Sequence, residues 1–272
     1  MTTPHVEILA ALPGYGEEGN MVRVRFLCDG TSVKYGLIYM DAFHEEWYRA
    51  SRVNSVILPD LPEEWTWVCI CLNKETGMPF VLNYHNDPIQ CEDIAAWHPM
   101  AFEYTEIAKI EQIRVDRGRK EDRMWIVQHP SADKRCLMKI AEIPELMGHT
   151  KRETEIYKDL EGADIAPQFM GHVMEQGRIV GFLVEWIEDA EEPVLEFDTD
   201  LLADALSKLH ARGILHKDIH AGNFLIKDNR AYIIDFEYSD WSNKDEDFDE
   251  EIDQIYESSR FWNFTPDNDS SP

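Results

Sequence analysis

The sequence predicts an α+β fold, with short strands along the N-terminal part of the chain and few helices towards its end. Three features support this fold class. Apolar and polar residues alternate over 22–26, which is the period of a half-buried strand. Turn-forming pairs such as Asp29-Gly30 separate the strand-like runs at short intervals. Apolar residues at helical spacing first share one face over 150–160.

The composition limits the possible partners. The 272 residues are 44% hydrophobic, enough to build one ample domain or two modest ones. Acidic residues outnumber basic residues by 53 to 26, so the formal net charge is -27. A chain with this charge repels nucleic acids and anionic lipids at long range, so we expect no nucleic-acid partner. No run approaches the about 18 apolar residues of a membrane span, so we expect no membrane association.

The N-terminus and the cysteines indicate a cytoplasmic protein. The first residues lack the basic and apolar regions of a secretory signal. The five cysteines are scattered and form no C-x-x-C pair. An odd number of scattered cysteines is typical of reduced, packed thiols in the cytosol.

Residues 1–100 are predicted to form a β-rich region of unknown role. One hairpin is expected from 22–26 to 33–40, and a second from 65–72 to 79–84. We recognise no catalytic motif in this region.

After residue 102 the pattern predicts three strands, over 110–115, 124–128 and 135–140, followed by a helix over 150–160. One face of that helix carries Glu153 together with three apolar residues. A buried carboxylate needs a cation as partner, and Lys139 on the preceding strand is the obvious candidate.

The chain then continues with a buried-type strand over 178–187 and a very acidic segment over 188–204. An amphipathic helix with Leu202 and Leu209 on its apolar side follows, and Gly213 is expected to end it.

The segment from 214 to 237 contains the most informative motif. Asp218 is followed by Asn223 and, after an apolar strand, by Asp235. This spacing resembles the catalytic and metal loops of the protein-kinase-like superfamily. The resemblance covers about residues 105–240.

The resemblance implies a protein-kinase-like two-lobed fold. It comprises a β-rich N-lobe over 101–184, a hinge over 185–187 and a reduced helical C-lobe over 188–240. Residues 1–100 form an extra β-rich region outside it. Residues 241–272 form an acidic C-terminal helix or tail, which we expect to be solvated rather than catalytic.

The resemblance also implies the cofactors ATP and Mg²⁺. Asp218 would accept or orient the proton of an attacking hydroxyl group, while Asn223 and Asp235 would hold the metal ion. His216 would orient the loop and be structural.

The remaining implied roles concern the nucleotide. Lys139 would bind the α and β phosphates and would be positioned by Glu153. Main-chain groups of Glu185, Trp186 and Ile187 would bind adenine as the hinge.

Finer features resemble the small-molecule branch of the superfamily. His220 looks like the aminoglycoside and choline phosphotransferases, and 235–239 resembles the metal motif of choline and ethanolamine kinases. The stretches 153–157 and 165–172 are similar to small fungal kinase-like proteins, which are usually assigned as phosphotransferases by similarity.

The sequence departs from the kinase pattern in three places. Glu237 replaces the glycine that protein kinases have after Asp-Phe, but phosphotransferases of the small-molecule branch dispense with that glycine. The loop 116–123 has one glycine instead of a glycine-rich run. The surrounding segment 114–139 carries eight bases and four acids, which suits either a phosphate-facing hairpin or solvated turns. The C-lobe is too short for the usual peptide-substrate elements.

The leading hypothesis is an ATP- and Mg²⁺-dependent phosphotransferase (a kinase) that acts on a hydroxyl group, most simply of a small molecule. The acidic segment 188–204 favours a cationic acceptor or is simply a solvated face. The alternatives are a pseudokinase that serves as a binding module or scaffold and an atypical protein kinase. A protein partner could complete the acceptor site.

Overall fold

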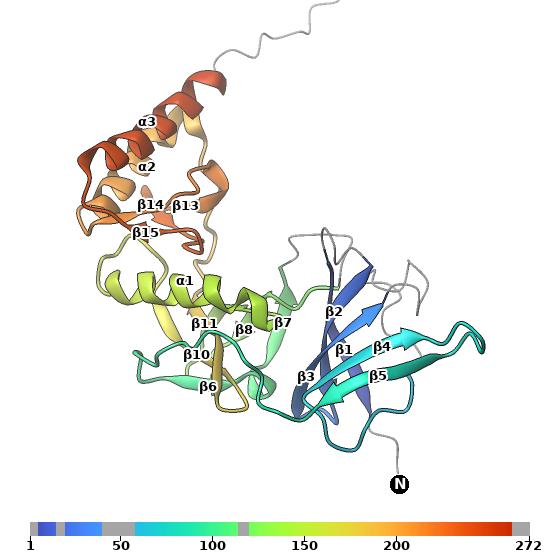
Figure 1. The fold of residues 1–272 in the computed structure, drawn as a ribbon. Coiled ribbons are helices and arrows are strands. Elements are labelled where there is room, and N and C mark those ends of the chain that lie inside the picture. The colour runs from blue at the N-terminus through green and yellow to red at the C-terminus, as the bar shows by residue number, and fades with distance from the viewer. Residues whose placement is uncertain (1–4, 15–19, 40–57, 114–119, 263–272) are drawn as a thin grey trace, which may run out of the picture. The chain divides into compact units, whose positions relative to one another are not determined.

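The computed structural model describes residues 5–14, 20–39, 58–113 and 120–262 (Figure 1). Contacts divide the chain into two compact units. The first comprises 1–148 and 171–183, and the second comprises 149–170 and 184–272.

A five-stranded sheet occupies the N-terminal part of the first unit, with its strands in chain order (Figure 1). All neighbouring strands are antiparallel except the third and fourth, which are parallel. The strands are β1 (Val6–Pro13), β2 (Met21–Cys28), β3 (Ser32–Tyr39), β4 (Trp67–Leu72) and β5 (Pro79–His85). Three residues connect β2 and β3, and two of them, Asp29 and Gly30, adopt left-handed φ of 51° and 71°. The amide of Thr31 closes the turn by donating to the carbonyl of Cys28 at 3.1 Å.

A six-stranded sheet forms the rest of the first unit, in the order β6-β10-β11-β9-β8-β7. Its strands are β6 (Ala101–Glu103), β7 (Lys109–Gln112), β8 (Met124–Gln128), β9 (Arg135–Ile140), β10 (Phe169–Glu175) and β11 (Arg178–Glu185). The ends of β10 and β11 belong to the second unit. Short 3-10 helices cover Tyr104–Glu106 and Pro144–Leu146.

The second unit contains the longer helices and two small sheets (Figure 1). The helices are α1 (Met147–Asp159), α2 (Leu195–His210) and α3 (Asp245–Trp262). β12 (Ile214–Leu215) pairs with β15 (Asp240–Trp241), and β13 (Phe224–Lys227) pairs with β14 (Arg230–Ile233). A 3-10 turn covers Ala221–Asn223.

These elements confirm a chain of mixed α and β structure. The strands predicted over 124–128 and 135–140 have those bounds. The described part of the strand predicted over 110–115 ends at Gln112, and residues 114 and 115 lie outside the described residues. α1 begins three residues before the predicted start, and its predicted apolar face is buried. α2 begins at Leu195, so residues 195–204 of the predicted acidic segment are helical.

α2 ends at His210 with Ala211 as its C-cap, so the prediction that Gly213 ends this helix is wrong. Gly213 instead belongs to the turn that follows. Its amide donates to the carbonyl of His210 at 2.8 Å, and its φ of 72° lies in the region that favours glycine. Among the described helices, none combines the length and the apolar character needed to cross a bilayer. All five cysteines are free thiols.

Candidate functional site

Three carboxylates come together in the second unit. One oxygen from each of Glu153, Asp235 and Glu237 lies within 4.8 Å of the other two. Glu153 comes from the buried face of α1, and it is only 2% exposed. Asp235 and Glu237 follow β14 and are half-buried. Two segments more than 80 residues apart in the sequence therefore bring three carboxylates together.

The backbone around Asp235 is held in an unusual conformation. Asp235 has a φ of 65°, which is uncommon for a residue with a side chain and is typical of functional turns. The two residues before it are fixed by main-chain hydrogen bonds. The amide of Ile233 donates to Ile165 at 2.7 Å, and the amide of Ile234 donates to the carbonyl of Asn223 at 2.9 Å. The second of these bonds links the turn directly to the loop that carries Asp218.

Asp218 and Asn223 form a second polar pair in the same unit. The side-chain amide of Asn223 donates to the main-chain carbonyl of Asp218 at 2.7 Å and to its carboxylate at 3.0 Å. His220 Nε2 lies 3.4 Å from the same carboxylate. Asn223 is buried, whereas the Asp218 side chain is 41% exposed. A buried amide thus orients a carboxylate that solvent or a substrate can reach.

His216 is buried beneath this loop and supports it. Its Nε2 lies 3.0 Å from the carbonyl of Ile234, which can only accept, so Nε2 carries a proton. Its ring packs against Phe224 and Phe236. Burial lowers the pKa of His216, which keeps the ring neutral. These contacts suit the structural role predicted for His216.

Glu251 of α3 is a residue that the sequence reasoning missed. Its carboxylate accepts hydrogen bonds from the main-chain amides of His216 at 3.1 Å and Lys217 at 2.6 Å, and His210 lies 2.8 Å away. Burial alone would raise the pKa of Glu251, but these hydrogen bonds outweigh it and lower the pKa.

The prediction that the acidic C-terminal helix is solvated is wrong at this position. Glu251 is 5% exposed, and Ile255, one helical turn later, is 2% exposed. An acid and an apolar residue at i and i+4 share one face of a helix. That spacing is the only sequence signal that could have singled out Glu251 among its acidic neighbours.

Glu237 was also not predicted as a site residue. It stands where the resemblance to protein kinases predicts glycine, so it counts as a departure from their pattern rather than as a predicted ligand. The structure brings its carboxylate to Asp235 because the turn after β14 keeps residues 235 and 237 on one side.

Tyr157 lies close to the carboxylates on the buried side of α1. Burial, followed by the charges of Glu153 and Asp235, raises its pKa well above the ordinary value. The phenol therefore stays protonated. The ring of Tyr157 packs edge-on against Phe236, with ring centroids 5.3 Å apart. Phe236 lies between Asp235 and Glu237 in the sequence, so this contact helps to hold the turn that carries both carboxylates.

The other predicted site residues are Lys139, which lies in the first unit, and the hinge residues 185–187, which lie in the second unit. Lys139 is on β9 in the first unit and is 6% exposed. Glu185 ends β11, and its amide donates to Gln168 at 2.8 Å; Trp186 and Ile187 follow it in the second unit, half-buried. Of the loop 116–123, residues 116–119 lie outside the described residues. The roles assigned to Lys139 and to the hinge stay predictions.

The residues present fit a hard divalent cation. Mg²⁺ prefers oxygen ligands and binds through one or two carboxylates together with substrate phosphates. Asp235 and Glu237 offer such oxygens within one turn, and Glu153 offers another. Asn223 directs its amide nitrogen to Asp218, which leaves its carbonyl oxygen as the atom that could face a cation.

Comparison with known protein families gives a match to the part of the chain that contains Asp218 and Asp235. No curated protein matches the sequence closely enough to be reported as a relative. Residues 166–248 match the phosphotransferase enzyme family. The matched segment contains Asp218, Asn223, Asp235 and Glu237 but neither Lys139 nor Glu153. The match supports a relationship between residues 166–248 and the protein-kinase-like phosphotransferase superfamily, and with it a phosphotransferase activity.

Proposed function

We propose that this protein is an ATP- and Mg²⁺-dependent phosphotransferase that transfers the γ-phosphate of ATP to a hydroxyl group of a small molecule. The observation that carries the proposal is the convergence of Glu153, Asp235 and Glu237 in the unit that also holds the Asp218–Asn223 pair. The match of residues 166–248 to the phosphotransferase enzyme family supports it.

Asp218 is the proposed catalytic residue. Phosphoryl transfer requires alignment of the nucleophile and neutralisation of developing charge, with little covalent work for the protein. The carboxylate of Asp218 is partly exposed and oriented by Asn223, so it can meet an acceptor hydroxyl group and take or orient its proton. The main-chain amides of His216 and Lys217, which precede Asp218, donate to Glu251 and so fix the chain that leads into this carboxylate.

Asp235, Glu237 and the carbonyl oxygen of Asn223 are the proposed metal ligands. A bound Mg²⁺ would neutralise the charge of the ATP phosphates and orient them. Glu153 either adds a ligand to this group, as its distance to Asp235 suggests, or pairs with Lys139 as the resemblance implies.

The nucleotide contacts are also part of the proposal. Lys139 would bind the α and β phosphates, and main-chain groups of 185–187 would bind adenine. We further propose a cytoplasmic location because all five cysteines are free thiols.

The proposal is tested by measuring ATP consumption with panels of hydroxylated metabolites, both neutral and cationic, and with generic protein substrates. Asp218→Ala and Asp235→Ala are expected to reduce turnover by at least about 10²-fold, the usual contribution of a general base. Asp249→Ala is a matched control, because Asp249 is an exposed aspartate on α3, outside the acidic segment 188–204. Full activity in both site variants would refute the proposal.

A thermal-shift titration separates an enzyme from a binding module that lacks activity. A nucleotide at 100 times its Kd stabilises the native state by about 2.7 kcal/mol. An Mg²⁺-dependent shift that Asp235→Ala removes supports the metal ligands proposed here. A shift without turnover on any acceptor would favour the pseudokinase alternative, and phosphorylation of only the protein substrates would favour an atypical protein kinase.

A further inference from the structure

We propose that a cavity of the first unit binds a small zwitterion, a free amino acid. The cavity has a volume of about 410 Å³, which lies in the range of small-molecule sites. It is lined by the first residues of β3, by residues on both sides of Trp65 and by the chain around the turn between β10 and β11. Its described lining contains none of the residues proposed above for ATP, Mg²⁺ or catalysis, so the inference goes beyond the proposed function and does not depend on it.

Two cations and two carboxylates line this cavity. The cations are Lys34 on β3 and Arg178 at the start of β11, and the carboxylates are Glu63 and Glu64. Both cations are half-buried, whereas both carboxylates are exposed. Among the described residues, no ion pair joins either of these cations to either of these carboxylates. The cavity therefore offers charges of both signs that do not neutralise one another.

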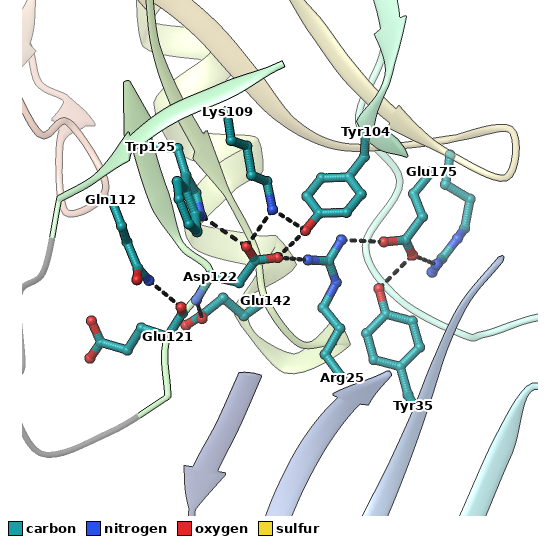
Figure 2. Close-up of polar contacts among 11 residues, drawn as sticks. Arg25, Tyr35, Tyr104, Lys109, Gln112, Glu121, Asp122, Trp125, Glu142 and Glu175 are labelled. Atoms are coloured by element: carbon teal, nitrogen blue, oxygen red, sulfur yellow. Dashed lines mark hydrogen bonds and ion pairs between the residues drawn. The ribbon is translucent and has the colours of Figure 1, made fainter. Parts of the chain in front are cut away.

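Arg178 is held in place by a buried carboxylate. Its guanidinium donates to Glu175 at 2.7 Å. Glu175 also accepts from Arg25 at 2.6 Å and from the hydroxyl group of Tyr35 at 2.5 Å (Figure 2). The side chain of Glu175 is 2% exposed, and donors from both sheets of the unit fix it. Arg178 therefore has a defined position, while 24% of its own side chain stays exposed.

The ion cluster around Glu175 carries an excess of positive charge. Three cations share two carboxylates in its ion pairs, and these residues are Arg25, Lys109, Arg178, Asp122 and Glu175 (Figure 2). Glu142 lies beside the cluster, but burial raises its pKa to about 7, so it offsets the excess only in part at neutral pH. Of the five paired residues, Arg178 is the one that lines the cavity. An anionic ligand group beside Arg178 would compensate this charge.

Lys34 supplies a second positive charge and is also positioned. Its ammonium group lies 4.8 Å from the centre of the Trp65 ring. Trp65 is 3% exposed and packs edge-on against Phe26, with ring centroids 5.7 Å apart. Within the described part of the chain, Lys34 forms no ion pair with a carboxylate. The carboxylate of a ligand would give this ammonium group a partner.

Glu63 and Glu64 place negative charge beside the same aromatic ring, because both directly precede Trp65. Glu64 accepts a hydrogen bond from the side-chain amide of Asn86 at 3.3 Å. A ligand with only negative charge would be repelled by these two carboxylates, and a ligand with only positive charge would be repelled by the two cations. A zwitterion, whose carboxylate meets the cations and whose ammonium group meets the carboxylates, avoids both costs.

The turn between β10 and β11 closes one side of the cavity. Gln176 and Gly177 form this turn with φ of 51° and 83°. The side-chain amide of Gln176 donates to the hydroxyl group of Ser32 at 2.9 Å, which joins the turn to β3. Because the turn and Arg178 are already ordered, a ligand does not lose free energy to ordering them.

The experiment is calorimetry of the full chain, without nucleotide, with the standard free amino acids as probes. The tightest-binding amino acid is then compared with its N-acetyl derivative, which lacks the ammonium group, and with its amide, which lacks the carboxylate. We expect at least one amino acid to bind with a Kd below about 1 mM, and each derivative to bind at least about tenfold more weakly. Absence of binding by every amino acid overturns the inference, and so does a derivative that binds as tightly as its parent.

Charge-removing variants locate the binding. We expect Lys34→Gln to raise the Kd about tenfold and Glu63→Gln about threefold, because Lys34 is positioned whereas Glu63 is exposed to solvent. Lys74→Gln and Glu75→Gln are matched controls, since they remove the same charges from an exposed turn that does not line the cavity. They should change the Kd by less than about twofold.

Glu63→Gln decides the question by itself if Lys34→Gln does not fold, because the side chain of Glu63 is exposed. An unchanged Kd in every folded site variant overturns the inference, and so do controls that weaken binding as much as the site variants. The measurement needs neither ATP nor an acceptor, so its failure leaves the proposed function standing.

Discussion

Replacing Glu251 by Gln should destabilise the segment that leads into Asp218. The carboxylate of Glu251 accepts three hydrogen bonds, from two main-chain amides and from His210. One of these amides belongs to Lys217, whose φ of 64° is costly for a residue with a side chain. Gln keeps the size of the side chain but has a single accepting oxygen, so at least one donor loses its partner.

The magnitude follows from the number of bonds affected. A hydrogen bond to a charged group contributes about 1.5–3 kcal/mol, whereas one between neutral groups contributes about 0.5–1.5 kcal/mol. Glu251→Gln loses one of the former and weakens the other two. We expect the free energy of unfolding to fall by about 3 kcal/mol, and the Tm by about 6–12 °C for a protein of this size.

The assay is thermal unfolding at neutral pH combined with hydrogen exchange of the peptide that contains His216 and Lys217. Glu250→Gln is the matched control, because its side chain is exposed on the same helix. A Tm within about 2 °C of wild type, with unchanged exchange of the Lys217 amide, would refute the role assigned to Glu251.

The same residue predicts a loss of stability in acid. The pKa of Glu251 is lowered in the folded protein from its ordinary value of 4.5. Its contribution is therefore fully present above pH 4.5 and is lost as the pH falls through the lowered folded value. The difference in unfolding free energy between wild type and Glu251→Gln should shrink over that range. A difference that stays constant down to strongly acidic pH would contradict this.

Glu142→Gln should change the pH dependence in the opposite sense. Burial raises the pKa of Glu142 from 4.5 to about 7; a main-chain hydrogen bond from Asp122 opposes this shift, and the charges of Asp122 and Glu121 add to it. The contribution of Glu142 to the free energy of unfolding is therefore full below pH 4.5 and is lost as the pH rises through about 7. Denaturant unfolding at several pH values should show wild type losing up to about 3 kcal/mol over that range, and Glu142→Gln losing clearly less; identical slopes would refute this. Gly181→Ala should lower stability by about 1–3 kcal/mol or prevent folding, because a Cβ there would lie 2.3 Å from the carbonyl oxygen of Lys139 on the neighbouring strand. Gly148→Ala, by contrast, adds a Cβ in open space on α1 and should raise the free energy of unfolding by about 0.5–1 kcal/mol in the same assay. A lower free energy of unfolding for Gly148→Ala would contradict the placement of residue 148 in a helix.

Local periodicity was sufficient for many elements of the fold. The alternation over 22–26 and the turn pair Asp29-Gly30 predict the hairpin of β2 and β3, because strand period and turn conformation depend on neighbours in sequence. The buried face of α1 follows from residues at i, i+3 and i+4. The start of α2 could not be predicted in this way, since its first turn is acidic and only the apolar face that begins near Leu202 shows the helical period.

The candidate site was predictable only in part. The spacing of Asp218, Asn223 and Asp235 is a local motif and can be read directly. The arrival of Glu153 beside Asp235 and Glu237 depends on how α1 packs in the second unit, which spacing does not encode. The sequence suggested Lys139 as the partner of Glu153 because both suit a buried ion pair.

By itself, the sequence determined the α+β class, the strand and helix periods and the residue types of a phosphotransferase loop, because each depends on a few consecutive residues. Only the tertiary structure decided which charges meet. Arg25 donates to Asp122, which is 97 residues away in the sequence, and to Glu175, which is 150 residues away. Glu251 accepts from Lys217, which is 34 residues away. In a chain with 53 acidic residues, the carboxylates that become buried are those whose donors the fold brings within hydrogen-bonding distance, since burial without such donors is too costly.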